Sequence, residues 1–358
     1  MKTRALLLLG AAAIAAGPAR VATQQPRYPV TLVAPGKGPF SFPEGYQTPW
    51  DKIEISVTEK MSANLFVLHG SQGIDVAHPD ASGGRAMVLF GADGILMVDT
   101  QNRQVAEKTL KALRSFTDAP FKVLVNTHIH SDHTGADAFF ARQGALIYSQ
   151  ENLRNEMLRP PLRANGQPAP APEMAGVPVA TYSYNAAMPG APAVTFHMNG
   201  ETVDFIPMMP SHTAGDTIVR FRNANVIYIE DFYRNFGYPF ADQANGGSIK
   251  GMLEAIDLIE KLADPNTTLV PGHGTLVTKR DLLPYRAMLV DVMAKVKTLR
   301  DRNTSLRDVL AANLTAPYDK TTLGDTQQSK DRFITEVYDE VKDFPPIVDG
   351  KRTMPIHQ

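Results

Sequence analysis

The sequence predicts an α/β fold in which helices cover a β-sheet, and three features lead to this prediction. Apolar runs of strand length crowd the first half of the chain, beginning at residues 53–57. Between residues 86 and 148, strand-like and helix-like segments alternate, as they do in sheets covered by helices. Two later segments, 249–262 and 285–299, carry apolar residues at helical spacing. A sheet with helices outside it accounts for all three.

Short apolar runs without helical spacing are expected to be strands. These runs are residues 53–57, 65–68, 86–90, 95–98, 121–126, 145–148, 193–197, 203–207, 218–221, 226–229 and 267–270. Asp93-Gly94 and Asn199-Gly200 stand between consecutive runs and predict hairpin turns. Helices are expected at residues 104–116, 137–143, 249–262 and 285–299, with two more in the tail. Ser248 is the expected N-cap of the third of these helices.

Composition limits the class of protein. The chain has 358 residues, of which 43% are hydrophobic and 20% charged, as in soluble globular proteins. Its formal net charge of −1 provides no basic surface for nucleic acid. Cysteine is absent, which excludes disulfides, thiolate metal ligands, a cysteine nucleophile and a lipid anchor on cysteine.

The N-terminal residues resemble a secretory signal peptide. A basic start, Met1–Arg4, precedes a twelve-residue apolar run and then small residues up to Ala22. A membrane-spanning helix needs about 20 apolar residues, so we expect no stable membrane anchor after cleavage. The predicted location is the periplasm or the extracellular medium. Residues 23–52, rich in proline and glycine, are expected to form an extended arm.

The main domain is predicted to span residues 53–302, with a helical tail at 303–358. Eight prolines within residues 159–192 predict an irregular insertion. This insertion is either a passive surface segment or a flap beside the functional site. In the second case Met174, Tyr182 and Tyr184 are its candidate contacts.

The stretch Thr127–Gly135 carries the clearest functional signal. It places His128, His130, Asp132 and His133 directly after an apolar run. Residues two apart in an extended segment point to the same side, so His128 and His130 can bind one cation together. A helix beginning near Asp132 would let it and His133 reach a second cation. Neutral imidazole and carboxylate ligands suit zinc, with iron and manganese as competitors.

Other polar residues follow apolar runs in the same way, and chemistry at strand ends is the usual arrangement of an enzyme site. These residues are Asp99, His128, His212, Asp231 and His273. We expect two cations, one held by three histidines and the other by the remaining ligands: His128, His130 and His212 for the first, and Asp132, His133 and His273 for the second. Asp231 would bridge the pair. Asp99 is either a helix cap or an acceptor that holds the metal loop from behind.

The motif His-x-His-x-Asp-His-x-Gly, followed by a distant histidine, an aspartate after a strand and a Gly-His-Gly, resembles the metallo-β-lactamase superfamily. The resemblance runs from about residue 53 to residue 300. It implies a four-layer αββα sandwich with the site at one edge of the paired sheets. It also implies a pair of zinc ions, the ligand assignments given above, and Asp99 buried behind the ligands.

Two positions depart from the pattern of this family. The best-known β-lactamases carry cysteine where this chain has Asp231, and an aspartate there is more similar to glyoxalase II-type and lactonase-type hydrolases. The residue before it is usually glycine but is Glu230 here. Its carboxylate would strengthen metal binding, point away, or crowd the bridging position.

The predicted function is a zinc-dependent hydrolase that uses a metal-bound hydroxide on a small acyl substrate such as a β-lactam, a lactone or another ester or amide. Asp132 would orient the hydroxide as well as bind metal. Tyr233 and Arg234 are candidate contacts for a substrate carboxylate. The alternatives are an iron-dependent oxidoreductase on the same fold and a non-enzymatic zinc-binding module. The substrate and the oligomeric state are left open.

Overall fold

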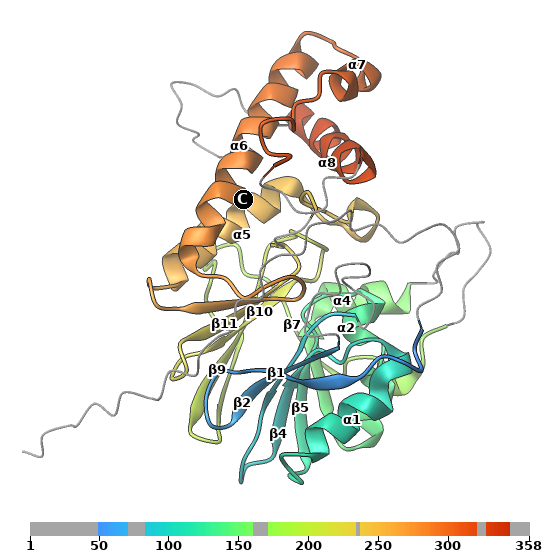
Figure 1. Cartoon of the computed structure of the whole chain (residues 1–358), viewed down its shortest axis with the longest axis vertical. Coiled ribbons are helices and arrows are strands. Elements are labelled where there is room, and N and C mark those ends of the chain that lie inside the picture. The colour runs from blue at the N-terminus through green and yellow to red at the C-terminus, as the bar shows by residue number, and fades with distance from the viewer. Residues whose placement is uncertain (1–48, 71–82, 160–170, 234–236, 321–326, 344–358) are drawn as a thin grey trace, which may run out of the picture.

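The computed structural model describes residues 49–70, 83–159, 171–233, 237–320 and 327–343. Within these residues the chain forms two β-sheets that pack face to face, with helices on both outer faces (Figure 1). The four-layer αββα sandwich is therefore confirmed. The predicted signal peptide and all but the last few residues of the predicted arm lie outside the described residues.

In the described part of the chain, the first sheet has seven strands in sequential order. Its first four strands pair antiparallel, and from β4 onward the pairs are parallel. The strands are β1 (Ile55–Lys60), β2 (Leu65–Gly70), β3 (Ala86–Leu89), β4 (Ile95–Val98), β5 (Phe121–Val125), β6 (Leu146–Gln150) and β7 (Ala180–Tyr182). The turn predicted at Asp93-Gly94 joins β3 to β4 as a hairpin.

The second sheet has five strands in the described residues, in the order β12-β11-β10-β9-β8. Only β11 and β12 are parallel; the other pairs are antiparallel. The strands are β8 (Val194–Met198), β9 (Glu201–Pro207), β10 (Thr217–Phe221), β11 (Val226–Glu230) and β12 (Thr268–Pro271). Asn199 and Gly200 turn the chain between β8 and β9 with positive φ angles of 51° and 77°, as the hairpin signal predicts.

Alternation along the strands sorts the apolar residues into layers. Leu96 and Val98 of β4 face the space between the sheets, whereas Ile95 and Met97 face the helices outside. The outer layer on the first sheet contains α1 (Ala106–Arg114) and α3 (Asp137–Arg142). The outer layer on the second sheet contains α5 (Ile249–Leu262), α6 (Lys279–Asp301), α7 (Leu306–Ala311) and α8 (Gln327–Glu340).

Two segments differ from their predicted character. The proline-rich insertion contributes β7, which extends the first sheet beyond β6, because extended backbone pairs readily at a sheet edge. The helix α4 (Glu151–Leu158) was not predicted because its only fully buried residue is Leu153, which leaves no apolar stripe.

None of the described helices combines the length and the apolar character needed to cross a membrane.

The tail does not stand apart from the domain. Phe333, Ile334 and Val337 of α8 are buried in the same core as α5 and α6. The last elements in the structure, α8 and the short 3₁₀ helix Val341–Asp343, therefore complete the outer layer of the second sheet (Figure 1).

The core between the sheets can be tested with Phe205 of β9, which is fully buried and packs against the rings of Tyr148 and Phe196. Phe205→Ala is expected to lower the free energy of unfolding by about 3–5 kcal/mol, because the cavity would lie between two rigid sheets. Leu283→Ala is the control, since Leu283 is 49% exposed, and should cost less than about 0.5 kcal/mol. Urea unfolding measures both, and equal losses would contradict a packed core between the sheets.

Candidate metal centre

The loops that follow β4, β5, β9, β11 and β12 meet at one edge of the sandwich, and the predicted ligands meet there with them. Within the described residues, three overlapping groups of side chains have ligand atoms within 4.8 Å of one another and are able to hold metal. The groups are His128 with His130 and His212, His128 with His133 and Asp231, and Asp132 with His133 and His273. All seven predicted ligands are thus brought together.

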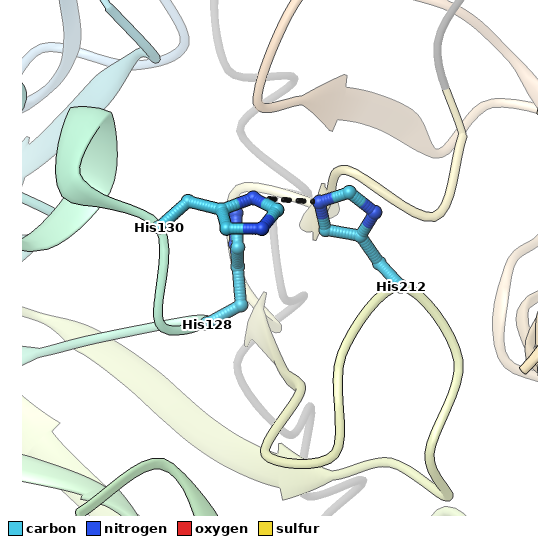
Figure 2. A group of neighbouring side chains, drawn as sticks. All are labelled: His128, His130 and His212. Atoms are coloured by element: carbon cyan, nitrogen blue, oxygen red, sulfur yellow. Dashed lines mark hydrogen bonds between the residues drawn. The ribbon is translucent and has the colours of Figure 1, made fainter. Parts of the chain in front are cut away.

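The three-histidine group is built from two loops. His128 and His130 stand in the extended segment after β5, and His212 comes from the loop after β9 (Figure 2). Nδ1 of His130 lies 3.1 Å from Nε2 of His212, and the ring of His128 lies 4.8–4.9 Å from the other two rings. One ring nitrogen from each histidine can therefore face a common point.

The group of Asp132, His133 and His273 depends on the short helix α2 (Ser131–Thr134), which begins directly after His130. The helical turn lets Asp132 and His133 reach the same point, as expected for a helix that begins near Asp132. His273, after β12, completes the group: its Nε2 lies 3.0 Å from Oδ2 of Asp132 and 3.2 Å from Nε2 of His133.

Asp231 lies between the three-histidine group and the group of Asp132, His133 and His273. Its carboxylate oxygens are 3.6 Å from Nε2 of His133, 3.8 Å from Nε2 of His212 and 3.3 Å from Nε2 of His273. Asp231 thus reaches ligands of both groups, which is the position a bridging carboxylate requires. Its assignment as a ligand stays a prediction, as do those of the other six residues.

The structure explains why Glu230 does not crowd this position. Glu230 has a φ of +47°, a left-handed conformation that glycine adopts most easily, which accounts for the glycine usual at this point. Its fully buried side chain lies behind His128, with Oε2 at 3.5 Å from Nδ1 of that ring, and it also accepts a hydrogen bond from the backbone N–H of Asp231. The carboxylate therefore points away from the space between the groups.

Asp99 holds the metal loop from behind and does not cap a helix. Its oxygens accept hydrogen bonds from the backbone N–H of Thr127 at 2.8 Å, the Thr127 hydroxyl at 2.7 Å and Nδ1 of His133 at 2.8 Å. The Tyr228 hydroxyl, from the second sheet, lies 3.2 Å from Oδ2. Since a carboxylate only accepts, His133 must carry its proton on Nδ1 and present the Nε2 lone pair to the site.

Sequence reasoning missed Arg85, which is almost fully buried and supports the His273 loop. Its guanidinium donates to the carbonyls of Pro271 and Gly274, and its backbone N–H donates to the carbonyl of Gly272. The only available signal was a charged residue directly before the apolar run 86–90. Asp242, another missed residue, accepts a hydrogen bond from Nε2 of His130 at 2.8 Å, and no strand pattern precedes it in the sequence.

The electrostatics favour the metal-binding forms of His128 and Asp132, whereas they favour the protonated form of His133. Burial lowers the pKa of His128 well below its ordinary value, and the neighbouring histidines lower it further, so its imidazole is neutral. Burial alone would raise the pKa of Asp132, but His133 and His273 lower it well below its usual range. Burial likewise opposes the charge on His133, yet Asp231, Asp132 and Asp99 raise its pKa to about 8.

The residues present fit a divalent metal. Nε2 of His128 and Oδ1 of Asp231 are buried without a hydrogen-bond partner among the described residues. Buried polar atoms are costly to leave unpaired, and both belong to one of the three groups. Neutral imidazoles with carboxylates are a donor set that zinc accepts.

The remaining predicted residues are placed differently. Tyr233 is buried in the core beneath α6, where its ring packs 4.9 Å from that of Tyr285, and this is the packing of a core residue. Arg234 lies outside the described residues. His69 lies in β2 with Nε2 2.6 Å from the Gly83 carbonyl, and His197 is exposed on β8, so neither joins the site.

Gly272 provides a test of how tightly the site is packed. A Cβ atom there would overlap Oδ1 of Asp231 and Cε1 of His133. Gly272→Ala is therefore expected to displace Asp231 and to reduce metal uptake at least tenfold, measured by elemental analysis after dialysis against zinc. Gly200→Ala is the control: its φ of +77° makes alanine strained, but no atom lies within 4 Å. Normal metal uptake in Gly272→Ala would contradict the packing described here.

Comparison with known proteins agrees with this geometry. The metallo-beta-lactamase superfamily is matched over residues 80–273. No curated protein matches the chain. A metallo-beta-lactamase from Pontibacter korlensis is 18% identical with a TM-score of 0.52, and the match covers 67% of this chain and 100% of that one. The stereoselective inverting sec-alkylsulfatase Pisa1 from Pseudomonas sp. is 14% identical with a TM-score of 0.59, and the match covers 87% of this chain but 58% of that one.

Identities this low show that the folds are alike and nothing more. The family match, however, spans more than half of the sequence, so the chain belongs to the metallo-beta-lactamase superfamily.

Proposed function

We propose that the protein is a zinc-dependent hydrolase acting on a small acyl substrate. The observation that carries this proposal is the set of three overlapping ligand groups at one edge of the sandwich, in which Asp231 of the middle group lies within 4 Å of a histidine in each of the other two. A single structural zinc site would need one closed set of four ligands. Seven side chains that converge on one region are better suited to two cations.

Zinc bound here would lower the pKa of a coordinated water to about 7 and polarise a scissile carbonyl, so hydrolysis needs no serine or cysteine nucleophile. The chain's own residues prepare for this chemistry. Neutral His128 offers the Nε2 lone pair, and Asp99 fixes the proton of His133 on the outer nitrogen. The side chain of Asp132 is 30% exposed whereas His133 beside it is buried. An ionised Asp132 at the opening of the site can therefore accept a hydrogen bond from the attacking water and orient it.

The proposed substrate is a β-lactam, a lactone or another small ester or amide. The predicted signal peptide supports a substrate outside the cytoplasm, in the periplasm or beyond. The formal charge of −1 disfavours nucleic acid. An alkyl sulfate ester belongs in any substrate panel, because the fold similarity to the sec-alkylsulfatase extends over 87% of this chain.

His128→Ala tests the proposal directly. We expect it to lose metal uptake and turnover together, whereas exposed His197→Ala should retain both. The measurement is elemental analysis of purified protein, coupled to a panel of a chromogenic cephalosporin, a lactone, a thioester, a phosphodiester and an alkyl sulfate. Full activity in His128→Ala would refute the assignment. Iron in the purified protein would instead support an oxidoreductase, and bound zinc without turnover would support a non-enzymatic module.

Zinc binding should also release protons in a pH-dependent way. Because the pKa of His133 is raised to about 8, this ring is mostly protonated at pH 7 in the metal-free protein. The metal needs the Nε2 lone pair, so binding at pH 7 should displace about one proton from His133. At about pH 9 the ring is already neutral, so its share of the release should approach zero, while a coordinated water with a pKa near 7 would release its own proton. An NMR titration of the metal-free protein checks the share of His133: its ring should lose a proton near pH 8, and a ring already neutral at pH 7 would contradict the prediction.

A further inference from the structure

The loop of residues 237–247 lies between the three-histidine group and the C-terminal helices, and it holds two of the three rings. Asp242 accepts from Nε2 of His130 at 2.8 Å, and the Phe240 carbonyl accepts from Nδ1 of His212 at 2.8 Å. The backbone N–H of Asp242 donates to the His212 carbonyl, also at 2.8 Å. The Phe240 ring lies parallel to His130 and edge-on to His212.

These contacts decide which nitrogen of each ring faces the site. A carboxylate and a carbonyl can only accept, so His130 must carry its proton on Nε2 and His212 on Nδ1. The lone pairs are then left on Nδ1 of His130 and Nε2 of His212, the two atoms that face each other in Figure 2. The two rings thus use opposite nitrogens toward one point, and Asp242 fixes the choice for His130.

Helix α8 in turn holds the loop. The carboxylate of Glu336 accepts a hydrogen bond from the backbone N–H of Ala241 at 3.1 Å. The backbone carbonyl of Glu336 accepts one from the side-chain amide of Gln243, also at 3.1 Å. The Arg332 guanidinium lies 4.4 Å from the centre of the Phe240 ring, a cation–π distance. Glu336 is 5% exposed, so its hydrogen bond to the loop is shielded from water.

The same helix fixes both ends of the loop. Near its start, the Ser329 hydroxyl accepts from the backbone N–H of Tyr238 at 2.8 Å, and the Tyr238 ring stacks on Phe333. Just past its end, Glu340 accepts from the backbone N–H groups of Ile249 and Lys250, at the start of α5. The contacts from Ser329 to Glu340 run along the length of α8, so the helix supports the whole loop.

We propose that Asp242 is a positioning residue of the three-histidine group and that α8 holds it in place, so that the zinc affinity of this group depends on the C-terminal helix. The inference rests on the proposed zinc function. Residues that hold a metal-binding histidine from behind change metal affinity by about 10–100-fold when removed. The C-terminal tail, whose described residues belong to none of the three ligand groups, is by this account a part of the metal centre.

The test uses the full chain and zinc alone, with affinity measured by competition against a chromophoric chelator. Asp242→Ala should weaken zinc binding at the three-histidine group by about 10–100-fold. Asp242→Asn should lose less, because its amide oxygen still accepts from His130. Asp264→Ala is the matched control: Asp264 is an exposed aspartate in the turn between α5 and β12, outside the loop of residues 237–247, and it accepts from the backbone N–H of Asn266 at 2.6 Å. It should stay within about threefold of the wild type.

The contribution of α8 is tested with Glu336→Ala, which should weaken zinc binding in the same direction as Asp242→Ala. Asp339→Ala is its control, because Asp339 is an exposed acidic residue of the same helix. Circular dichroism establishes that each variant is folded. The visible spectrum after cobalt(II) substitution supplies a readout of ligand geometry: it should change in Asp242→Asn and Asp242→Ala but not in Asp264→Ala or Asp339→Ala.

The outcomes separate the two proposals. If the wild type binds no divalent metal, the proposed function fails and this inference fails with it. If the wild type binds zinc and folded Asp242→Ala binds it equally well, with an unchanged cobalt spectrum, the inference alone is overturned. If Glu336→Ala lowers thermal stability but leaves zinc affinity at the wild-type value, the part assigned to α8 is overturned.

Discussion

The buried carboxylate of Asp99 is the contact on which the site most depends. It stands at the end of β4 with a φ of 57° and no exposed surface, and it contacts the Thr127 segment of the first sheet and Tyr228 of the second. A buried carboxyl group is tolerated only when protein groups replace its contacts with water. Because the groups around Asp99 come from both sheets and from His133, this one side chain connects the sheets at the edge where the ligands converge.

The convergence has an electrostatic consequence. Two carboxylates, those of Asp132 and Asp231, lie within one small region together with five imidazole rings: those of His128, His130, His133, His212 and His273. Without a cation these charges balance one another: His133 and His273 lower the pKa of Asp132, and Asp231 and Asp132 raise the pKa of His133. Two divalent ions would supply fixed positive charge instead. The fold therefore assembles a set of groups that is better satisfied with metal than without it.

The sequence predicted those parts of the site in which the polar residue directly follows a strand. Thr127–Gly135, His212, Asp231 and His273 were found because strand ends place side chains at one edge of a sheet. Asp242 could not be found in this way: it lies in a loop whose path is set by tertiary contacts to α8. Glu336 was equally hidden, since an acidic residue on an amphipathic helix is ordinarily a solvated one. The four-layer arrangement followed from the family resemblance, whereas the alternation alone predicted only a sheet with helices outside it.

The two ligand groups are held by different parts of the chain. His133 and His273 are supported by Asp99 and by the loop that Arg85 fixes, all within the sandwich itself. His130 and His212 are supported by the loop of residues 237–247, which rests on α8. The three-histidine group therefore depends on the outer helices, whereas the group of Asp132, His133 and His273 depends on contacts within the sandwich. Asp231, at the end of β11, contacts both groups, so the position of this one carboxylate couples the two supports.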